Sequence, residues 1–348
     1  MHIPDGYLSP QTNAVLGAAS ALALAAASYK TARTVKAKYI PLLSIGAAFS
    51  FTIQMFNIPV PDGTTAHAVG GTLLTILLGP WAAMIAISVA LTLQAVFFGD
   101  GGILALGANI FNMGVILPFV SYAIYRVIAG SSTVSSKRRL IAAGIAGYIG
   151  ITAAAAMAGV EFGLQPLLFH AADGTPLYSP YGLNVALPAM LFAHLTIAGP
   201  VEGVVTLLAV AYLQRTNSSL LAANGEGKTR SSISWKRVAI IFAVLVALSP
   251  LGLLAKGTAW GEWSGEEIGA AVGFIPAGMD KFSSFWRHSI LPDYGLSGYN
   301  HSFWQQTLGY LLSALGALAL IALATIIIQR IARRGGDRDG SAPLAPRK

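Results

Sequence analysis

The first two residues of the chain, Met1 and His2, carry three nitrogen atoms that could bind one metal ion. The α-amino nitrogen, the amide nitrogen of His2 and its imidazole Nδ1 can close fused chelate rings around that ion. The imidazole of His67 could fill the fourth place. Four nitrogen ligands that include a deprotonated amide favour square-planar coordination, which suits Ni(II) or Cu(II) better than Zn(II). Because His2 is bulky, we expect Met1 to be retained.

Each histidine lies next to the same turn phrase. Pro4-Asp5-Gly6 follows His2, and Pro61-Asp62-Gly63 precedes His67. Pro fixes φ and Gly tolerates positive φ, so Pro-Asp-Gly strongly favours a chain reversal. We therefore expect the first turn to fold the N-terminus back towards His67.

Each histidine also has a simpler interpretation. A histidine at position 2 is usually a solvated tail residue, and His67 alone at the start of an apolar helix is usually a hydrogen-bonded structural residue. The shared turn phrase, with both histidines expected at the same membrane surface, favours the interpretation as ligands.

The composition is typical of an integral membrane protein. The 348 residues are 55% hydrophobic and 10% charged, with a mean hydropathy of +0.64, whereas soluble domains are about 25% charged. There is no cysteine, which excludes disulfides, thiolate metal sites and thiol nucleophiles. The N-terminus lacks the basic residues and early cleavage site of a secretory signal peptide.

Nine apolar segments are candidates for membrane-spanning helices, since about 20 residues cross the bilayer core. The third is short and glycine-rich, and Gly199-Pro200 interrupts the seventh, where we expect a kink. The expected spans are 11–29, 39–57, 66–79, 81–98, 103–128, 139–160, 184–214, 237–254 and 307–330.

The basic residues predict the orientation of these spans. Segments 30–38, 126–139, 215–237 and the C-terminal tail hold 19 of the 22 Lys and Arg residues. Such segments are normally cytoplasmic, so we expect the N-terminus outside and the C-terminus in the cytoplasm. This placement accounts for the net charge of +8 without a nucleic-acid partner.

Several polar residues lie within the expected spans. Ionisable ones tend to be functional there. Gln54, Gln94, Asn109 and Asn112 could orient His67, or could simply bond one helix to another, which we favour for any single one of them. His194 is a weaker ligand candidate. Glu202 could contact a partner subunit or pair with a basic residue at the inner face.

Two blocks of the sequence carry a resemblance to a known family. MHIPDGYLSP and PDGTTAHAVGGTLLTILLGPWAAM resemble the CbiM/NikM family, the substrate-binding (S) membrane components of energy-coupling-factor transporters for nickel and cobalt. The resemblance implies a site formed by the Met1 amine, the amide nitrogen and imidazole of His2, and the imidazole of His67. It also implies a transmembrane coupling (T) subunit and cytoplasmic ATPase subunits as partners.

The resemblance divides the chain into three parts. Residues 1–215 are expected to form the metal-binding membrane domain, a seven-helix S-component bundle, and residues 216–236 a cytoplasmic linker. Residues 237–348 resemble the CbiN/NikN accessory subunit: two further transmembrane helices, an outer segment at 255–306 and a basic tail. The PDGLE phrase of that module is altered here to Pro-Asp-Tyr-Gly-Leu at 292–296.

The sequence therefore predicts an all-α, multi-pass protein of the inner (plasma) membrane that captures Ni²⁺ or Co²⁺ as a transported substrate. Gly227-Lys228-Thr229 ends like a phosphate-binding loop, but position 222, where the first glycine would be required, is alanine. Energy must then come from partner ATPases.

The alternative is a self-contained secondary metal transporter or channel, for which the spans offer few ionisable residues. H-E-x-x-H and other enzyme motifs are absent, so we do not expect an enzyme.

Overall fold

The computed structural model describes residues 1–34, 40–61, 64–222, 234–255, 257–299 and 301–336. Asp62-Gly63 of the second turn phrase and most of the predicted cytoplasmic linker lie outside these ranges. The elements in chain order are α1 (Pro10–Thr34), α2 (Ile40–Gln54), β1 (Ile58–Val60), β2 (Thr64–Ala66), α3 (Gly71–Leu78), α4 (Pro80–Leu93), η3 (Gln94–Phe98), α5 (Leu106–Asn109), η4 (Ile110–Ile116), α6 (Leu117–Ala129), α7 (Lys137–Leu168), α8 (Leu183–Ala193), η5 (His194–Ala198), α9 (Gly199–Thr216), α10 (Ser218–Ala222), α11 (Trp235–Leu248), η6 (Ser249–Leu254), α12 (Gly265–Val272), α13 (Ala277–Phe282), η7 (Pro292–Tyr294) and α14 (Phe303–Gly336).

The all-α prediction is confirmed, since the strands of the described chain form one short antiparallel hairpin, β1–β2. Seven helical segments are long and apolar enough to cross a membrane. They are Pro10–Arg33, Pro80–Phe98, Leu106–Ala129, Lys137–Leu168, Leu183–Thr216, Trp235–Leu254 and Phe303–Ile328.

Two of the nine expected spans are shorter than predicted. Helix α2 has 15 residues and α3 has eight, and eight helical residues rise only about 12 Å. Glycines end α3 on both sides, because Gly70 and Gly79 both adopt positive φ. Pro80 then starts α4, where its missing N–H is tolerated. Helix α3 is therefore a buried helix within the bundle that cannot span a membrane alone.

Three spans contain a π-helical turn, an irregularity that often occurs at functional sites. η3 closes α4, η4 joins α5 to α6, and η5 joins α8 to α9. η5 lies immediately before Gly199-Pro200, where the kink was expected. Proline provides no N–H for the helical ladder, so the chain widens before it. η3 ends at Phe98, and Gly99 caps it in the left-handed conformation directly before Asp100.

Helix α7 packs against α6, α8 and α9. Ten of its fourteen buried residues are alanine or glycine, and small side chains let helices approach closely. On other helices, large apolar side chains are exposed on the outside of the molecule, among them Leu22 of α1, Val127 of α6 and Ile240 of α11. An apolar exterior is suited to lipid.

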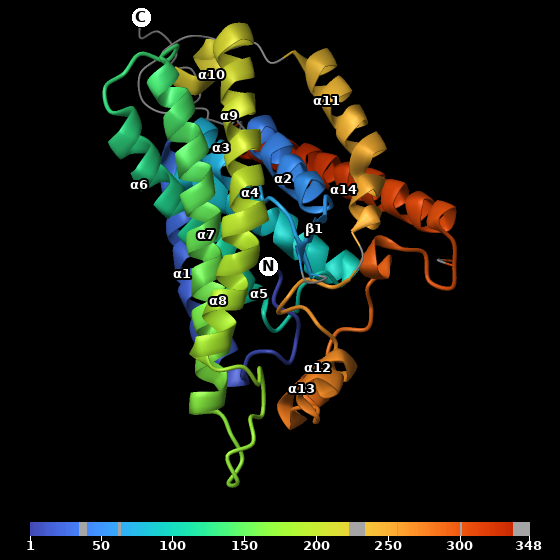
Figure 1. Cartoon of the computed structure of the whole chain (residues 1–348). Coiled ribbons are helices and arrows are strands. Elements are labelled where there is room, and N and C mark those ends of the chain that lie inside the picture. The colour runs from blue at the N-terminus through green and yellow to red at the C-terminus, as the bar shows by residue number, and fades with distance from the viewer. Residues whose placement is uncertain (35–39, 62–63, 223–233, 256, 300, 337–348) are drawn as a thin grey trace, which may run out of the picture.

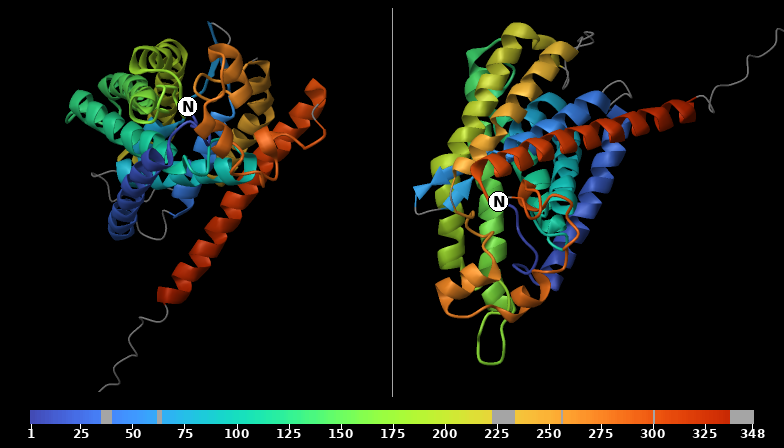
Figure 2. Two further views of the ribbon diagram at one scale, coloured as in Figure 1. Left: turned by 90° about the horizontal axis from the view of Figure 1, so that it is seen from below. Right: turned by 90° about the vertical axis from the view of Figure 1, so that its right-hand side faces the viewer.

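Figures 1 and 2 show the arrangement that positions the N-terminus. The α6–α7 connection, α10 and the start of α11 lie at one end of the bundle, opposite α12 and α13. The first residues begin inside the molecule, run towards the α12–α13 end, and there turn into α1 (Figure 1). Helix α14 crosses α2 obliquely (Figure 2). Which end faces the outside of the cell remains a prediction from charge.

Candidate metal site

Three hydrogen bonds to the backbone N–H and carbonyl of Ile3 hold the N-terminal segment in place. The Ile3 N–H donates to Asn109 Oδ1 at 2.7 Å, and Asn109 Nδ2 donates to the Ile3 carbonyl at 3.1 Å. The Gly102 N–H donates to the same carbonyl at 2.8 Å. Met1, His2 and Ile3 are all buried. The amine and His2 are therefore fixed inside the protein.

The first Pro-Asp-Gly phrase forms the expected turn. The Tyr7 N–H donates to the Pro4 carbonyl at 3.5 Å, and Gly6 adopts a φ of +92°. A Cβ at Gly6 would lie 2.8 Å from the Met279 carbonyl oxygen, so this position requires glycine on two grounds. The Asp5 carboxylate anchors the turn by accepting the N–H groups of Ile103, Leu104 and Ala105 at 3.2, 2.8 and 3.2 Å.

His67 lies between β2 and α3 with its ring 5% exposed. Its Nδ1 donates to the Ala68 carbonyl at 3.1 Å, which leaves a free lone pair on Nε2. Among the described residues, Nε2 has no hydrogen-bond partner. A buried polar atom left without a partner is costly, and a lone pair is what a metal ion requires.

Glu202 holds the backbone that follows His67. Its carboxylate accepts the N–H groups of Val69, Gly70 and Thr72 at 2.9, 2.8 and 3.1 Å, and it is fully buried. These N–H groups belong to the start of α3, where the helix dipole favours a negative charge. Its described partners are therefore backbone amides beside His67, whereas the sequence had suggested a partner subunit or a basic residue at the inner face.

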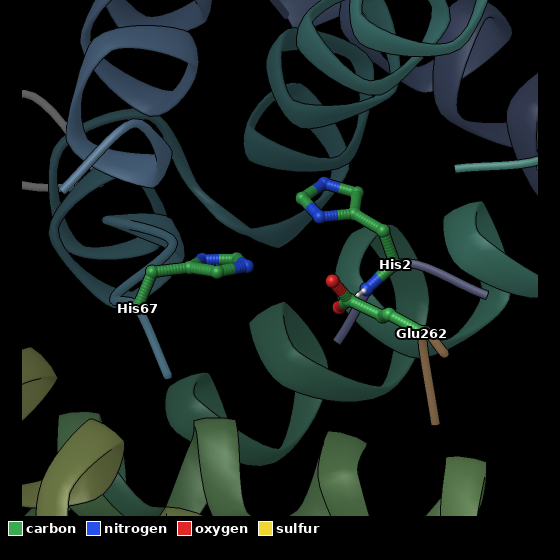
Figure 3. Close-up of side chains that lie close together, drawn as sticks. All are labelled: His2, His67 and Glu262. Atoms are coloured by element: carbon green, nitrogen blue, oxygen red, sulfur yellow. Dashed lines mark hydrogen bonds between the residues drawn. The ribbon is translucent and has the colours of Figure 1, made fainter. Parts of the chain in front are cut away.

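The structure brings His2 and His67 together. Their rings are stacked with centroids 5.0 Å apart and an interplanar angle of 24°. One ligand atom of each histidine and one of Glu262 lie within 4.8 Å of one another (Figure 3). Glu262 comes from the segment between η6 and α12, so a residue of the C-terminal part joins the pair.

Burial keeps both imidazoles neutral. It lowers the pKa of His2 to about 4, with the nearby N-terminal ammonium adding to the effect. Burial likewise lowers the pKa of His67 to about 3, again with the ammonium contributing. A neutral imidazole is the form that binds metal. Near neutral pH each ring therefore carries one lone pair, and that of His67 Nε2 has no partner among the described residues.

Two carboxylates face these groups. Oε1 of Glu262 pairs with the Met1 ammonium and accepts the N–H of His2 at 2.8 Å. Asp100 Oδ1 lies 3.2 Å from His2 Nδ1, while Tyr294 donates its hydroxyl to Asp100 Oδ2. Burial is the largest single influence on Glu262 and opposes its charge, but the ammonium and the two histidines together outweigh it and lower the pKa of its carboxyl.

The other polar candidates separate into two groups. Gln94 Oε1 lies 3.3 Å from His2 Nε2, and Asn109 holds Ile3, so both contact the N-terminal segment rather than His67. Asn112 bonds to Glu161 and His194 Nδ1 to the Met190 carbonyl, away from the two rings. Gln54 donates to the Ser50 carbonyl, and its side chain also acts on the His2 imidazole.

Sequence reasoning missed Glu262, Asp100 and Tyr294. A faint signal existed for each: a lone acid between tryptophans in Trp-Gly-Glu-Trp, the acid of Phe-Phe-Gly-Asp-Gly-Gly, and the tyrosine that alters the accessory-module phrase. No spacing rule connects residue 262 to residue 1, because the contact depends on tertiary structure.

Comparison with known proteins gives concordant results. Residues 2–220 match the family described as CbiM, cobalt uptake substrate-specific transmembrane region. The fused nickel transport protein NikMN of Rhodobacter capsulatus is 46% identical over 357 aligned positions, which cover 97% of this chain and 100% of that protein. The probable fused nickel transport protein LarMN of Lactiplantibacillus plantarum is also 46% identical, over 93% of this chain and 96% of its own length.

A solved structure supports the fold. The crystal structure of a truncated transition metal transporter is 58% identical, with a TM-score of 0.58, and covers 62% of this chain and 99% of its own. The relatives are named as transport proteins rather than enzymes. This chain is thus a multi-pass membrane protein that belongs to the CbiM family, with a NikN-like module fused at its C-terminus.

Proposed function

We propose that this protein captures Ni²⁺ or Co²⁺ at the outer face of the inner membrane for uptake into the cell. The ligands are the α-amino nitrogen of Met1, the amide nitrogen and imidazole of His2, and the imidazole of His67. The ion is the transported substrate. The nickel and cobalt proteins among the relatives support this substrate class.

One observation carries the proposal. Two neutral, buried imidazoles are stacked 5.0 Å apart beside the chain's own amino group, and Nε2 of one of them has no partner among the described residues. A structural histidine pair would be expected to satisfy both rings with hydrogen bonds. Nitrogen ligands in this number favour late divalent transition metals.

We further propose that the chain is the S component of an energy-coupling-factor transporter. A T subunit and cytoplasmic ATPase subunits would supply the energy. Family membership supports this arrangement. Uptake of radioactive Ni²⁺ in cells should then require the ATPase subunits, whereas a self-contained secondary transporter would work without them.

The metal site can be tested directly on purified protein with a native N-terminus. Titration with NiCl₂, with metal content read by elemental analysis, should give one ion per chain. An extra residue before Met1, or acetylation of its amine, should abolish tight binding, and so should His67→Ala. His288→Ala removes an exposed histidine and serves as the matched control. Undiminished binding by the acetylated protein would refute the amine as a ligand. Competition between Ni²⁺ and Co²⁺ in the same assay determines the preferred ion.

A further inference from the structure

Glu262 lies in a segment clamped onto the metal-binding part of the chain. The Trp260 N–H donates to Thr64 Oγ1 at 2.7 Å, and the Tyr7 hydroxyl donates to the Trp263 carbonyl at 2.8 Å. The Trp260 ring also packs against Phe162, with ring centroids 6.0 Å apart. These contacts fix the backbone on both sides of Glu262. The fold therefore holds its carboxylate beside the N-terminus.

The position of this carboxylate conflicts with that of the ion. A metal bound to a deprotonated amide replaces the amide proton and lies along the same direction, about 2.0 Å from the nitrogen. The His2 N–H is directed at Glu262 Oε1, 2.8 Å away. The ion would therefore lie about 0.8 to 1.5 Å from Oε1, less than the roughly 2.0–2.2 Å of a metal–oxygen bond. Ion and oxygen cannot keep these positions together.

A second contact strengthens the conflict. The same Oε1 pairs with the Met1 ammonium, so one oxygen atom engages two of the four proposed nitrogen ligands. Metal binding removes a proton from both nitrogens, after which neither can hold the carboxylate as it does here. The side chain of Glu262 is 20% exposed, which provides a direction in which it can withdraw.

We propose that Glu262 is an internal competitor of the metal: its carboxylate occupies the ion's position and must withdraw when the ion binds. This inference rests on the proposed function. It gives the C-terminal module a defined chemical role. The module supplies a carboxylate that competes with the ion when the ion binds, and the same carboxylate can displace the ion again. A carboxylate ligand would act in the opposite sense and add to affinity.

Glu262→Asp separates the two roles. Aspartate keeps the negative charge and its attraction for the ion, but its side chain is one methylene shorter and cannot reach the amine and the His2 amide from the same backbone. Affinity for Ni²⁺, measured by competition with a chelator of known strength, is expected to rise about tenfold, the equivalent of one charge-assisted hydrogen bond. Glu266→Asp makes the same change at an exposed residue in the first turn of α12, four residues further along the chain, and should leave affinity unchanged.

Glu262→Ala provides a second reading if the aspartate variant is poorly folded. It removes the competitor and the charge together and should bind at least as tightly as wild type. Equal or weaker binding by Glu262→Asp, in protein that elutes as wild type on size exclusion, would overturn the inference and indicate a ligand or a purely structural residue. If wild type itself bound no nickel, or if His67→Ala bound it as well as wild type, the proposed function would fail and this inference with it.

Discussion

Glu202→Gln is expected to weaken metal binding although Glu202 contacts none of the proposed ligand atoms. Its carboxylate accepts three backbone N–H groups directly after His67, those of Val69, Gly70 and Thr72. Glutamine has the same shape but only one acceptor oxygen. That oxygen can keep the pair at Val69 and Gly70, and the amide NH₂ then faces the Thr72 N–H.

The size of the effect follows from these three bonds. A hydrogen bond to a charged group contributes about 1.5–3 kcal/mol and a neutral one about 0.5–1.5 kcal/mol. Losing one charged bond and neutralising two others corresponds to about 3.5–6 kcal/mol in the arrangement of residues 69–72. If about half of this acts on the position of His67, the binding-competent fraction falls and apparent affinity drops roughly 20- to 150-fold.

Calorimetric titration with NiCl₂ in detergent measures this loss, with thermal unfolding recorded on the same samples. Thr206→Val is the matched control, because Thr206 lies one turn further along α9, is buried, and has a hydroxyl without a described hydrogen-bond partner. It should bind nickel as wild type does. If Glu202→Gln lowered the melting temperature but left nickel affinity unchanged, Glu202 would only stabilise the bundle and the reasoning would be wrong.

Two further predictions concern the N-terminal segment and the pH dependence of stability. Gly102→Ala should weaken nickel binding, because a Cβ at Gly102 would overlap the Asp5 carboxylate and backbone nitrogen; Gly316→Ala, in open space on α14, should not, and equal titrations of the two variants would contradict this. In the presence of a chelator, the free energy of unfolding should fall as pH falls below 6.5. In that range the unfolded chain protonates His2 and His67. In the folded protein their pKa values of about 4 and about 3 keep both imidazoles neutral. Each histidine contributes about 1.4 kcal/mol per pH unit in that range, so the drop in melting temperature between about pH 7.5 and about pH 5.5 should be smaller in His67→Gln than in wild type. Parallel drops would show that His67 is not the group that titrates.

The parts of the fold that hydropathy controls were predictable from the sequence. Each expected span overlaps helical structure in the described residues, since a lipid-facing helix requires a long apolar run. Helix α3 is shorter than expected because most of it is buried by protein, where a long apolar run is not needed. The π-helical turns were also not visible, apart from the kink expected near Gly199-Pro200, because they depend on how neighbouring helices pack.

The candidate site was predictable only where its chemistry is local. Met1 and His2 are adjacent in the chain, and the turn phrase that follows them recurs beside His67, so the sequence itself connects the three residues. No sequence feature marks Glu262 or Asp100, because acidic residues are common next to membrane spans. Only the tertiary structure places Glu262 beside the Met1 amine and Asp100 beside the His2 imidazole. The role of Glu202 was misjudged for a related reason: its partners are backbone N–H groups, which have no signature in the sequence.

The ion pair between Met1 and Glu262 joins residues 261 positions apart, and this separation has a consequence for biosynthesis. The first residue leaves the ribosome long before the residue that faces it, and the metal-binding part can be inserted in the membrane while its amine still lacks that counter-charge. During this interval the site lacks the carboxylate that the completed chain places beside it. If Glu262 competes with the ion as proposed, a residue translated late would set the metal affinity of the first two, and a chain stopped before it would bind metal more tightly than the finished protein.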